Sequence, residues 1–192
     1  MPELLKQINW VDVVYALLFL GMVYRGTRTG VGAQLLSLAG WVAILYVSVR
    51  FYSLVSEAIF GSMLQDWAKP LSFFAIAALS FVVLKFIERI LSVVLGSELS
   101  VLEKVGGAVV AALRASILFG MIGFLLLLVP VDYLWYSAAK ASQTCMKFVN
   151  FDEVAYKAID GFLVTGDEKS ASRDVFDDLL NKKRSYDTKK GE

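Results

Sequence analysis

The residues of this chain that could do chemistry are ionisable side chains set within or beside long apolar runs. A charged side chain at the centre of a membrane helix costs about 2.5–3.5 kcal/mol, so each one needs a partner or water. Arg114 is the clearest case, because it lies nine residues into the apolar run of residues 105–129. We expect it to face protein or water, in either a structural ion pair or a transport site. The candidate carboxylate partners are Asp12, Glu98 and Glu103.

Other chemistry is limited by what the sequence lacks. The chain has no histidine, which excludes Ser–His–Asp and Cys–His catalysis and metal sites that use imidazole. Its single cysteine, Cys145, cannot form an internal disulfide. A hydrolase would have to rely on Asp12 and Glu103, with no second acid, base or nucleophile placed to help. We therefore predict a protein that is not an enzyme, with no catalytic, cofactor or metal site. The net charge of +1 gives no reason to expect nucleic acid as a partner.

The elements that must position these residues are predicted from hydropathy. The chain is 57% hydrophobic and 19% charged, whereas soluble domains average about 45–50% and about 25%. A membrane-spanning helix needs about 20 mostly apolar residues. The sequence therefore predicts an all-α membrane protein with four transmembrane helices and short connections. Arg50, Lys85 and Glu88 lie near segment ends, where we expect them to extend to the membrane interface. The four segments are residues 10–24, 31–51, 70–87 and 105–129.

The connecting segments divide the chain further. YRGTRTG, residues 24–30, reads as a tight turn that relies on glycine. Residues 52–69 are predicted to hold a short interfacial helix, and residues 88–104 an interfacial or re-entrant piece. We predict a membrane domain over residues 1–130, an amphipathic helical segment over 131–165 and a charged, disordered tail over 166–192. The N-terminus lacks the pattern of a cleavable signal peptide.

Small residues recur at a spacing of four along the last apolar segment, in two rows that lie along one side of a helix. Such rows let helix backbones approach closely in lipid. We expect this helix to be the packing centre of the fold or of a homo-oligomer. The rows are Gly107, Ala111 and Ala115, and Ala108, Ala112, Ser116 and Gly120.

The orientation in the membrane is predicted from the positive charges of the turn. Arg25 and Arg28 share a very short loop, which is the setting where the positive-inside rule is strongest. We therefore place this turn in the cytoplasm and both chain termini outside it.

Two blocks of the sequence resemble the colicin V production protein (CvpA) family of bacterial inner-membrane proteins, over about residues 9–130. In the second block Glu103, Lys104, Gly107 and Arg114 fit a looser version of the family pattern. A charged Arg–Glu pair of the family is replaced here by Ala33 and Gln34. In the first block the matching residues are Trp10, Asp12, Arg25, Gly26, Gly30, Leu36, Ser37, Leu38, Gly40 and Trp41.

The resemblance implies a multi-pass inner-membrane protein associated with toxin (bacteriocin) production or export and with envelope stress tolerance. Its partners would be the lipid bilayer, export or envelope proteins, and a second copy of the chain through the small-residue rows. The alternative is an ion or small-solute channel or transporter. It would use Arg114 and a helix break near Gly106–Gly107, because buried charges and interrupted helices mark ion paths.

Overall fold

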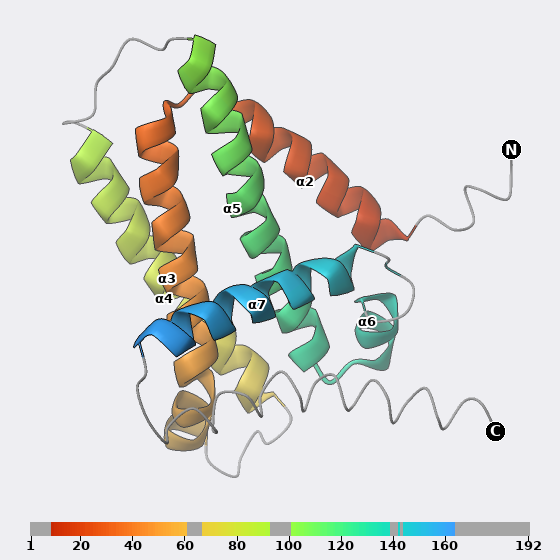
Figure 1. The fold of residues 1–192 in the computed structure, drawn as a ribbon. Coiled ribbons are helices and arrows are strands. Elements are labelled where there is room, and N and C mark those ends of the chain that lie inside the picture. Colours follow the sequence, from red (N-terminus) through yellow and green to blue (C-terminus); the bar gives the residue numbers. More distant parts are fainter. Residues whose placement is uncertain (1–8, 61–66, 93–100, 139–141, 143, 164–192) are drawn as a thin grey trace, which may run out of the picture.

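The fold is all-α, as the sequence predicts. The computed structural model describes residues 9–60, 67–92, 101–138, 142 and 144–163, and every regular element in these ranges is a helix (Figure 1). In chain order these are α2 (Trp10–Gly26), α3 (Val31–Val55), the π-helical turn η1 (Ser56–Phe60), α4 (Ala68–Ser92), α5 (Val101–Leu128), α6 (Asp132–Tyr136) and α7 (Cys145–Leu163).

Helix α5 is the centre of the arrangement. It packs against α2, α3 and α7, whereas α4 packs mainly against α3 (Figure 1). Helix α7 crosses the bundle and buries Cys145, Val149 and Tyr156. Phe119 of α5 stacks on Tyr15 of α2, with ring centroids 4.7 Å apart. The long apolar run that predicted this helix therefore also supplies the core.

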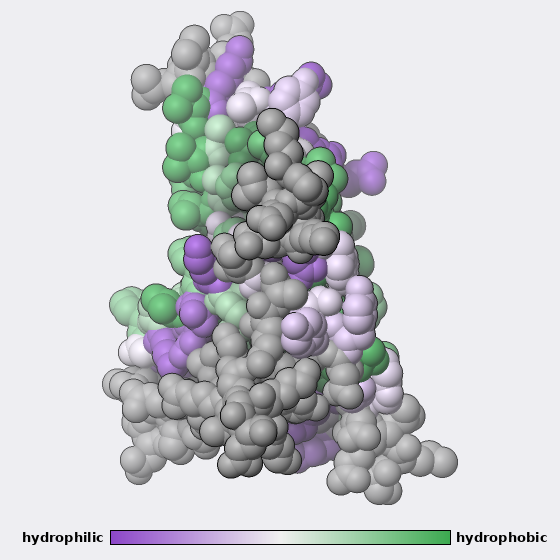
Figure 2. Space-filling model, turned by 90° about the vertical axis from the view of Figure 1, so that its right-hand side faces the viewer, coloured by the Kyte–Doolittle hydropathy of each residue, from purple (hydrophilic) through white to green (hydrophobic). Residues whose placement is uncertain are grey.

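Three helical segments are long and apolar enough to cross a membrane: Val31–Ile59, Ala68–Ile90 and Glu103–Leu128. The fourth predicted span is present as the 17-residue helix α2, and its crossing of the membrane stays a prediction. Large apolar side chains on α2 and α4 are exposed, among them Leu17, Leu79 and Phe86. Figure 2 shows apolar side chains gathered on the upper part of one face. The chain is therefore a multi-pass membrane protein whose helices present apolar side chains to lipid.

The predicted helix break near Gly106–Gly107 is wrong, because α5 runs without interruption through both residues. A Cβ at Gly107 would lie 2.5 Å from the carbonyl oxygen of Gly26 and 2.6 Å from that of Thr29. Gly107 has no side chain and so makes room for the backbone of the turn. The glycine therefore serves close packing, and α5 stays helical at this position.

The first small-residue row packs inside the chain. Gly107 is buried, and Ala111 and Ala115 have no exposed surface. This row is the packing centre of the fold, so it offers no surface to a second copy. In the second row Gly120 is buried under α7, whereas Ala108, Ala112 and Ser116 are half-buried.

The connections differ from the predicted boundaries because the helices extend into them. α3 continues to Val55 and passes directly into η1, and residues 61–66 of the predicted interfacial helix lie outside the described residues. α4 reaches Ser92 and α5 begins at Val101, which leaves the predicted re-entrant piece outside the described residues. The predicted segment of residues 131–165 contains α6 and α7. The predicted disordered tail, residues 166–192, also lies outside the described residues.

Candidate functional site

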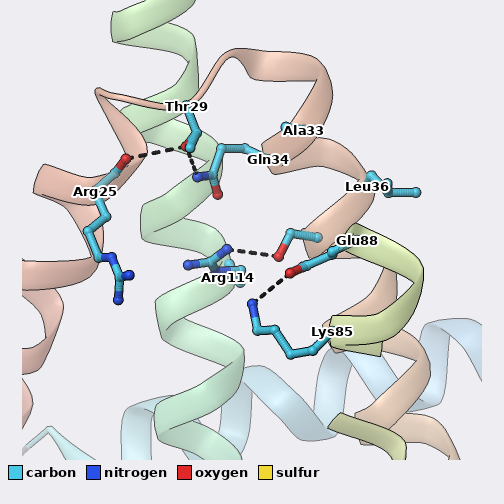
Figure 3. Close-up of a pocket in the computed structure, with 9 residues that line it drawn as sticks. Arg25, Thr29, Ala33, Gln34, Leu36, Lys85, Glu88 and Arg114 are labelled. Carbon is cyan, nitrogen blue, oxygen red and sulfur yellow. Dashed lines mark hydrogen bonds and ion pairs between the residues drawn. The ribbon is translucent and has the colours of Figure 1, made fainter. Parts of the chain in front are cut away.

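A polar pocket of about 470 Å³ lies where α2 ends and α3 begins (Figure 3). Its walls come from α2, α3, α4, α5 and the turn between α2 and α3. The lining residues are Arg25, Thr29, Ala33, Gln34, Leu36, Ser37, Lys85, Glu88 and Arg114. The site therefore joins segments that are far apart in the sequence.

Arg114 projects from the middle of α5 into this pocket. Its Nη1 donates a hydrogen bond to Ser37 Oγ at 2.8 Å. Its Nε is buried and has no hydrogen-bond partner among the described residues. The carboxylate that faces Arg114 is Glu88 of α4, and none of the expected partners lines the pocket. The expectation for Asp12 and Glu103 is wrong because their own helices place them elsewhere, and Glu98 lies outside the described residues.

Glu88 forms an ion pair with Lys85 one turn earlier on the same helix, with 2.6 Å between Nζ and Oε2. Glu88 also interacts with the Ser37 hydroxyl. The sequence predicts that Lys85 and Glu88 extend to the membrane interface, which stays a prediction, and both residues line the pocket. Their Lys-x-x-Glu spacing, which places two side chains on one helix face, was the available signal.

The turn supplies a second wall of the pocket. Thr29 Oγ1 donates to the backbone oxygen of Arg25 at 3.3 Å, and Gln34 Nε2 donates to Thr29 Oγ1 (Figure 3). Ala33 and Gln34, which replace a charged pair of the resembled family, both line the pocket. The departure from the family pattern therefore falls within the site.

The pocket carries an excess of positive charge. Arg25, Lys85 and Arg114 face it together with the single carboxylate of Glu88. Lys85 and Glu88 form an ion pair with each other. Arg25 and Arg114 form no ion pair among the described residues. The arrangement can bind an anion, because guanidinium groups donate two or more hydrogen bonds to the same oxyanion group.

The other predicted site residues lie outside the pocket. Asp12 Oδ1 accepts hydrogen bonds from Ser142 Oγ at 2.6 Å and from the Thr144 backbone N–H at 3.3 Å. Asp12 thus holds the chain that leads into α7. Trp41 packs against Phe81, with ring centroids 5.5 Å apart.

Five further predicted residues belong to the backbone contact or to the start of a helix. Gly26 and Gly107 form the backbone contact described above, and Gly30 is the N-cap residue of α3. Glu103 lies in the first turn of α5, and Lys104 is exposed beside it.

A second buried acid was missed by sequence reasoning. Asp152 of α7 is 1% exposed, and neither of its carboxyl oxygens has a hydrogen-bond partner among the described residues. Burial raises the pKa of this carboxyl to about 9. Its carboxyl lies against Gly120 of α5. Hydropathy gave no signal, because an acid on an amphipathic helix is normally expected on the solvent side.

Within the described residues, no group of three or more histidine, cysteine, aspartate or glutamate side chains could hold a metal ion.

Comparison with known proteins gives one finding. The family model for the colicin V production protein matches residues 11–152. The match includes α2 to α6 and the first turns of α7, and so extends beyond the predicted membrane domain. Neither a curated protein nor a solved structure matches the chain.

Proposed function

The chain belongs to the colicin V production protein family, and from this premise we propose a non-enzymatic integral protein of the bacterial inner membrane. It supports the production or export of a bacteriocin, or the homeostasis of the envelope, through the polar pocket described above. Family membership supports the role in toxin production, and the apolar helices support the membrane location.

The observation that carries the proposal is the meeting of the two family-like sequence blocks at one site. Arg25 and Ser37 belong to the first block, and Arg114 belongs to the second. All three line the same pocket, where Ser37 accepts a hydrogen bond from Arg114. Arg114 gives the strongest support, because an ionisable side chain within an apolar helix costs several kcal/mol and marks a functional site by default.

The test is complementation of a colicin V-producing strain that lacks its own copy of this gene. The secreted toxin is measured by the zone of growth inhibition, and the level of each variant in the membrane is measured by immunoblot. We expect the Arg114→Gln variant to lower the toxin titre at least tenfold at an unchanged protein level. Lys104→Gln, an exposed cation on the same helix, is the matched control. A normal titre from an Arg25→Gln/Arg114→Gln double variant would contradict the proposal.

A channel or transporter is the second candidate function. It is favoured by the volume of the pocket and by the half-buried Arg114, whereas the continuous helix α5 removes the helix break as support. Solute or ion flux in proteoliposomes that disappears in the Arg114→Ala variant would support it. Flux equal to that of empty vesicles would exclude it for the solutes measured.

We also propose a homo-oligomer and an orientation. Ala108, Ala112 and Ser116 are the half-buried part of the small-residue rows, and they offer the available face for a second copy. Chemical crosslinking and native mass measurement in detergent test this, and a strict monomer would contradict it. The turn of residues 24–30 is placed in the cytoplasm and both termini outside it, with export or envelope proteins as further partners.

A further inference from the structure

An apolar groove lies beside the polar pocket along the contact between α3 and α4. From this combination we propose that the site binds a phospholipid, with the phosphate between Arg25 and Arg114 and one acyl chain in the groove between α3 and α4. The inference rests on the proposed function of the pocket and names its ligand class. Binding is measured separately from toxin production, so either can fail alone.

The excess of positive charge in the pocket favours an anion. The Arg25 and Arg114 side chains have no ion pair among the described residues, and Glu88 is already paired with Lys85. The Ser37 hydroxyl accepts a hydrogen bond from Arg114 Nη1, and the buried Nε has no partner among the residues that the structure describes. Phosphate oxygens match guanidinium groups in geometry and charge. A phosphate group would therefore supply the counter-charge that the protein itself does not provide.

The groove is lined mainly by apolar residues, whereas the pocket is lined mainly by charged and polar ones. It holds about 310 Å³ between α3 and α4, and Ser80 is the polar residue of its lining. Leu79 and Val83 form its exposed wall, with exposed fractions of 69% and 52%. At its α3 wall Gly40 leaves room that the end of the Leu84 side chain occupies. The groove lining consists of Gly40, Ala43, Ile44, Val47, Leu79, Ser80, Val83, Leu84 and Ile87.

The pocket and the groove are successive lengths of the same α3–α4 contact. On α3, Ser37 of the pocket is followed by Gly40 and Ile44 of the groove, at helical steps of three and four. On α4, Glu88 of the pocket lies one turn from Leu84 of the groove. Residues at these spacings share one face of a helix. A ligand with a charged head and an apolar chain fits both parts, whereas a free anion would use the pocket alone.

The experiment measures binding to the purified full-length protein in detergent, by native mass spectrometry and by thermal shift. The three probes are phosphatidylglycerol, glycerol phosphate, which lacks the chains, and diacylglycerol, which lacks the phosphate. We expect saturable binding of phosphatidylglycerol, and binding of the other two at least tenfold weaker.

Matched variants locate the ligand. Arg25→Gln removes a cation that lines the pocket, and Val83→Trp fills the groove. Each should weaken phosphatidylglycerol binding at least tenfold. Arg28→Gln and Val82→Trp are the controls. Arg28 lies over the Tyr24 ring at 4.7 Å, and neither Arg28 nor Val82 lines the site.

Three results would overturn the proposal. Glycerol phosphate that binds as tightly as the lipid would make the site a small-anion pocket. Diacylglycerol that binds as tightly would remove the role of the phosphate. Equal binding to Val83→Trp and the unaltered protein would exclude the groove. Arg25→Gln with unchanged thermal stability but tenfold weaker lipid binding separates a binding role from a folding role.

Discussion

Asp152 is a buried acid on α7, a feature that a simple bundle of apolar helices would not have. Its carboxyl is packed against α5 at a position where only glycine leaves enough space. A carboxyl buried without hydrogen bonds favours its neutral form, and the pKa of Asp152 accordingly rises from an ordinary value of 3.8 to about 9. Near neutral pH this side chain is therefore protonated in the folded protein.

The stability of the protein should depend on pH through Asp152. Because its pKa is higher in the folded state than in the unfolded state, the folded state is favoured most below about pH 4. The stabilisation is lost progressively up to about pH 9, with a slope of at most about 1.4 kcal/mol per pH unit. Thermal unfolding in detergent between pH 5 and 9 measures this slope. Asp152→Asn should flatten the slope, whereas Glu153→Gln, an acid paired with Lys157 outside the core, should leave it unchanged.

The residues of the site could be predicted only in part from the sequence. Arg25 and Arg114 stand out because each is a permanent charge beside or within an apolar run. Lys85 and Glu88 could not be assigned, because a charge near the end of a span has an inexpensive alternative at the membrane interface. The partner of Arg114 depends on which helix packs beside it, and this pairing is a property of the whole fold.

Helix α7 is attached to the bundle by a short polar connection at its beginning. Asp12 accepts hydrogen bonds from Ser142 and Thr144, and the Ser142 hydroxyl accepts the backbone N–H of Cys145. These bonds satisfy donors that the first turn of a helix leaves free. Cys145 follows directly and is fully buried.

Removal of this connection should expose Cys145. Asp12→Ala takes away the acceptor, and the loss of a helix cap costs about 1 kcal/mol. Local opening should then increase roughly fivefold, which can be measured as the rate of maleimide labelling of the single cysteine. Glu153→Ala, which removes a half-buried acid paired with Lys157 of the same helix, should label at the rate of the unaltered protein. An unchanged rate in Asp12→Ala would show that other contacts hold the start of α7.

The contact between α5 and the turn should tolerate no added side chain at Gly107. The atoms that a new methyl group would meet are backbone oxygens, which cannot rotate away. We expect Gly107→Ala to destabilise the protein by about 1–3 kcal/mol, the usual cost of overpacking. Gly21→Ala on α2, where the surroundings are open, should be neutral or stabilising by up to about 1 kcal/mol. Denaturation in detergent compares the two variants. Equal stabilities would show that α5 can move away from the turn.

The helices themselves could be predicted because the length of an apolar run is a local property. The break at Gly106–Gly107 was predicted wrongly for a related reason. Two adjacent glycines weaken a helix when it is considered alone, and the sequence does not reveal that the turn of residues 24–30 lies against them. In the fold, the lack of a side chain at Gly107 lets α5 pack closely against the turn.

At the scale of the whole molecule, the number of membrane crossings depends on α2. Helix α2 has 17 residues and a length of about 25 Å, short of a hydrocarbon core of about 30 Å. If α2 crosses as predicted, both termini lie outside the cytoplasm. If only α3, α4 and α5 cross, the N-terminus lies on the cytoplasmic side of the membrane with the turn.

Reporter fusions distinguish these arrangements. Alkaline phosphatase, which is active only outside the cytoplasm, should be active at either end of the chain, and a fluorescent reporter that needs the cytoplasm should be dark there. An N-terminal fusion with cytoplasmic fluorescence would limit the crossings to three. The C-terminal fusion is the control, because it lies outside in both arrangements when the turn is cytoplasmic.

The contact between Gly26 and Gly107 has a mechanical consequence for the two arginines of the pocket. Arg25 is the neighbour of Gly26, and Arg114 lies seven residues, or about two helical turns, from Gly107. The contact joins the backbone of α5 to the backbone of the turn. A change of side-chain rotamer therefore cannot relieve a movement of α5 toward the turn. This contact therefore sets the distance between the backbone positions of Arg25 and Arg114. A change in the distance between these two backbone positions would require α5 to slide or tilt against the turn.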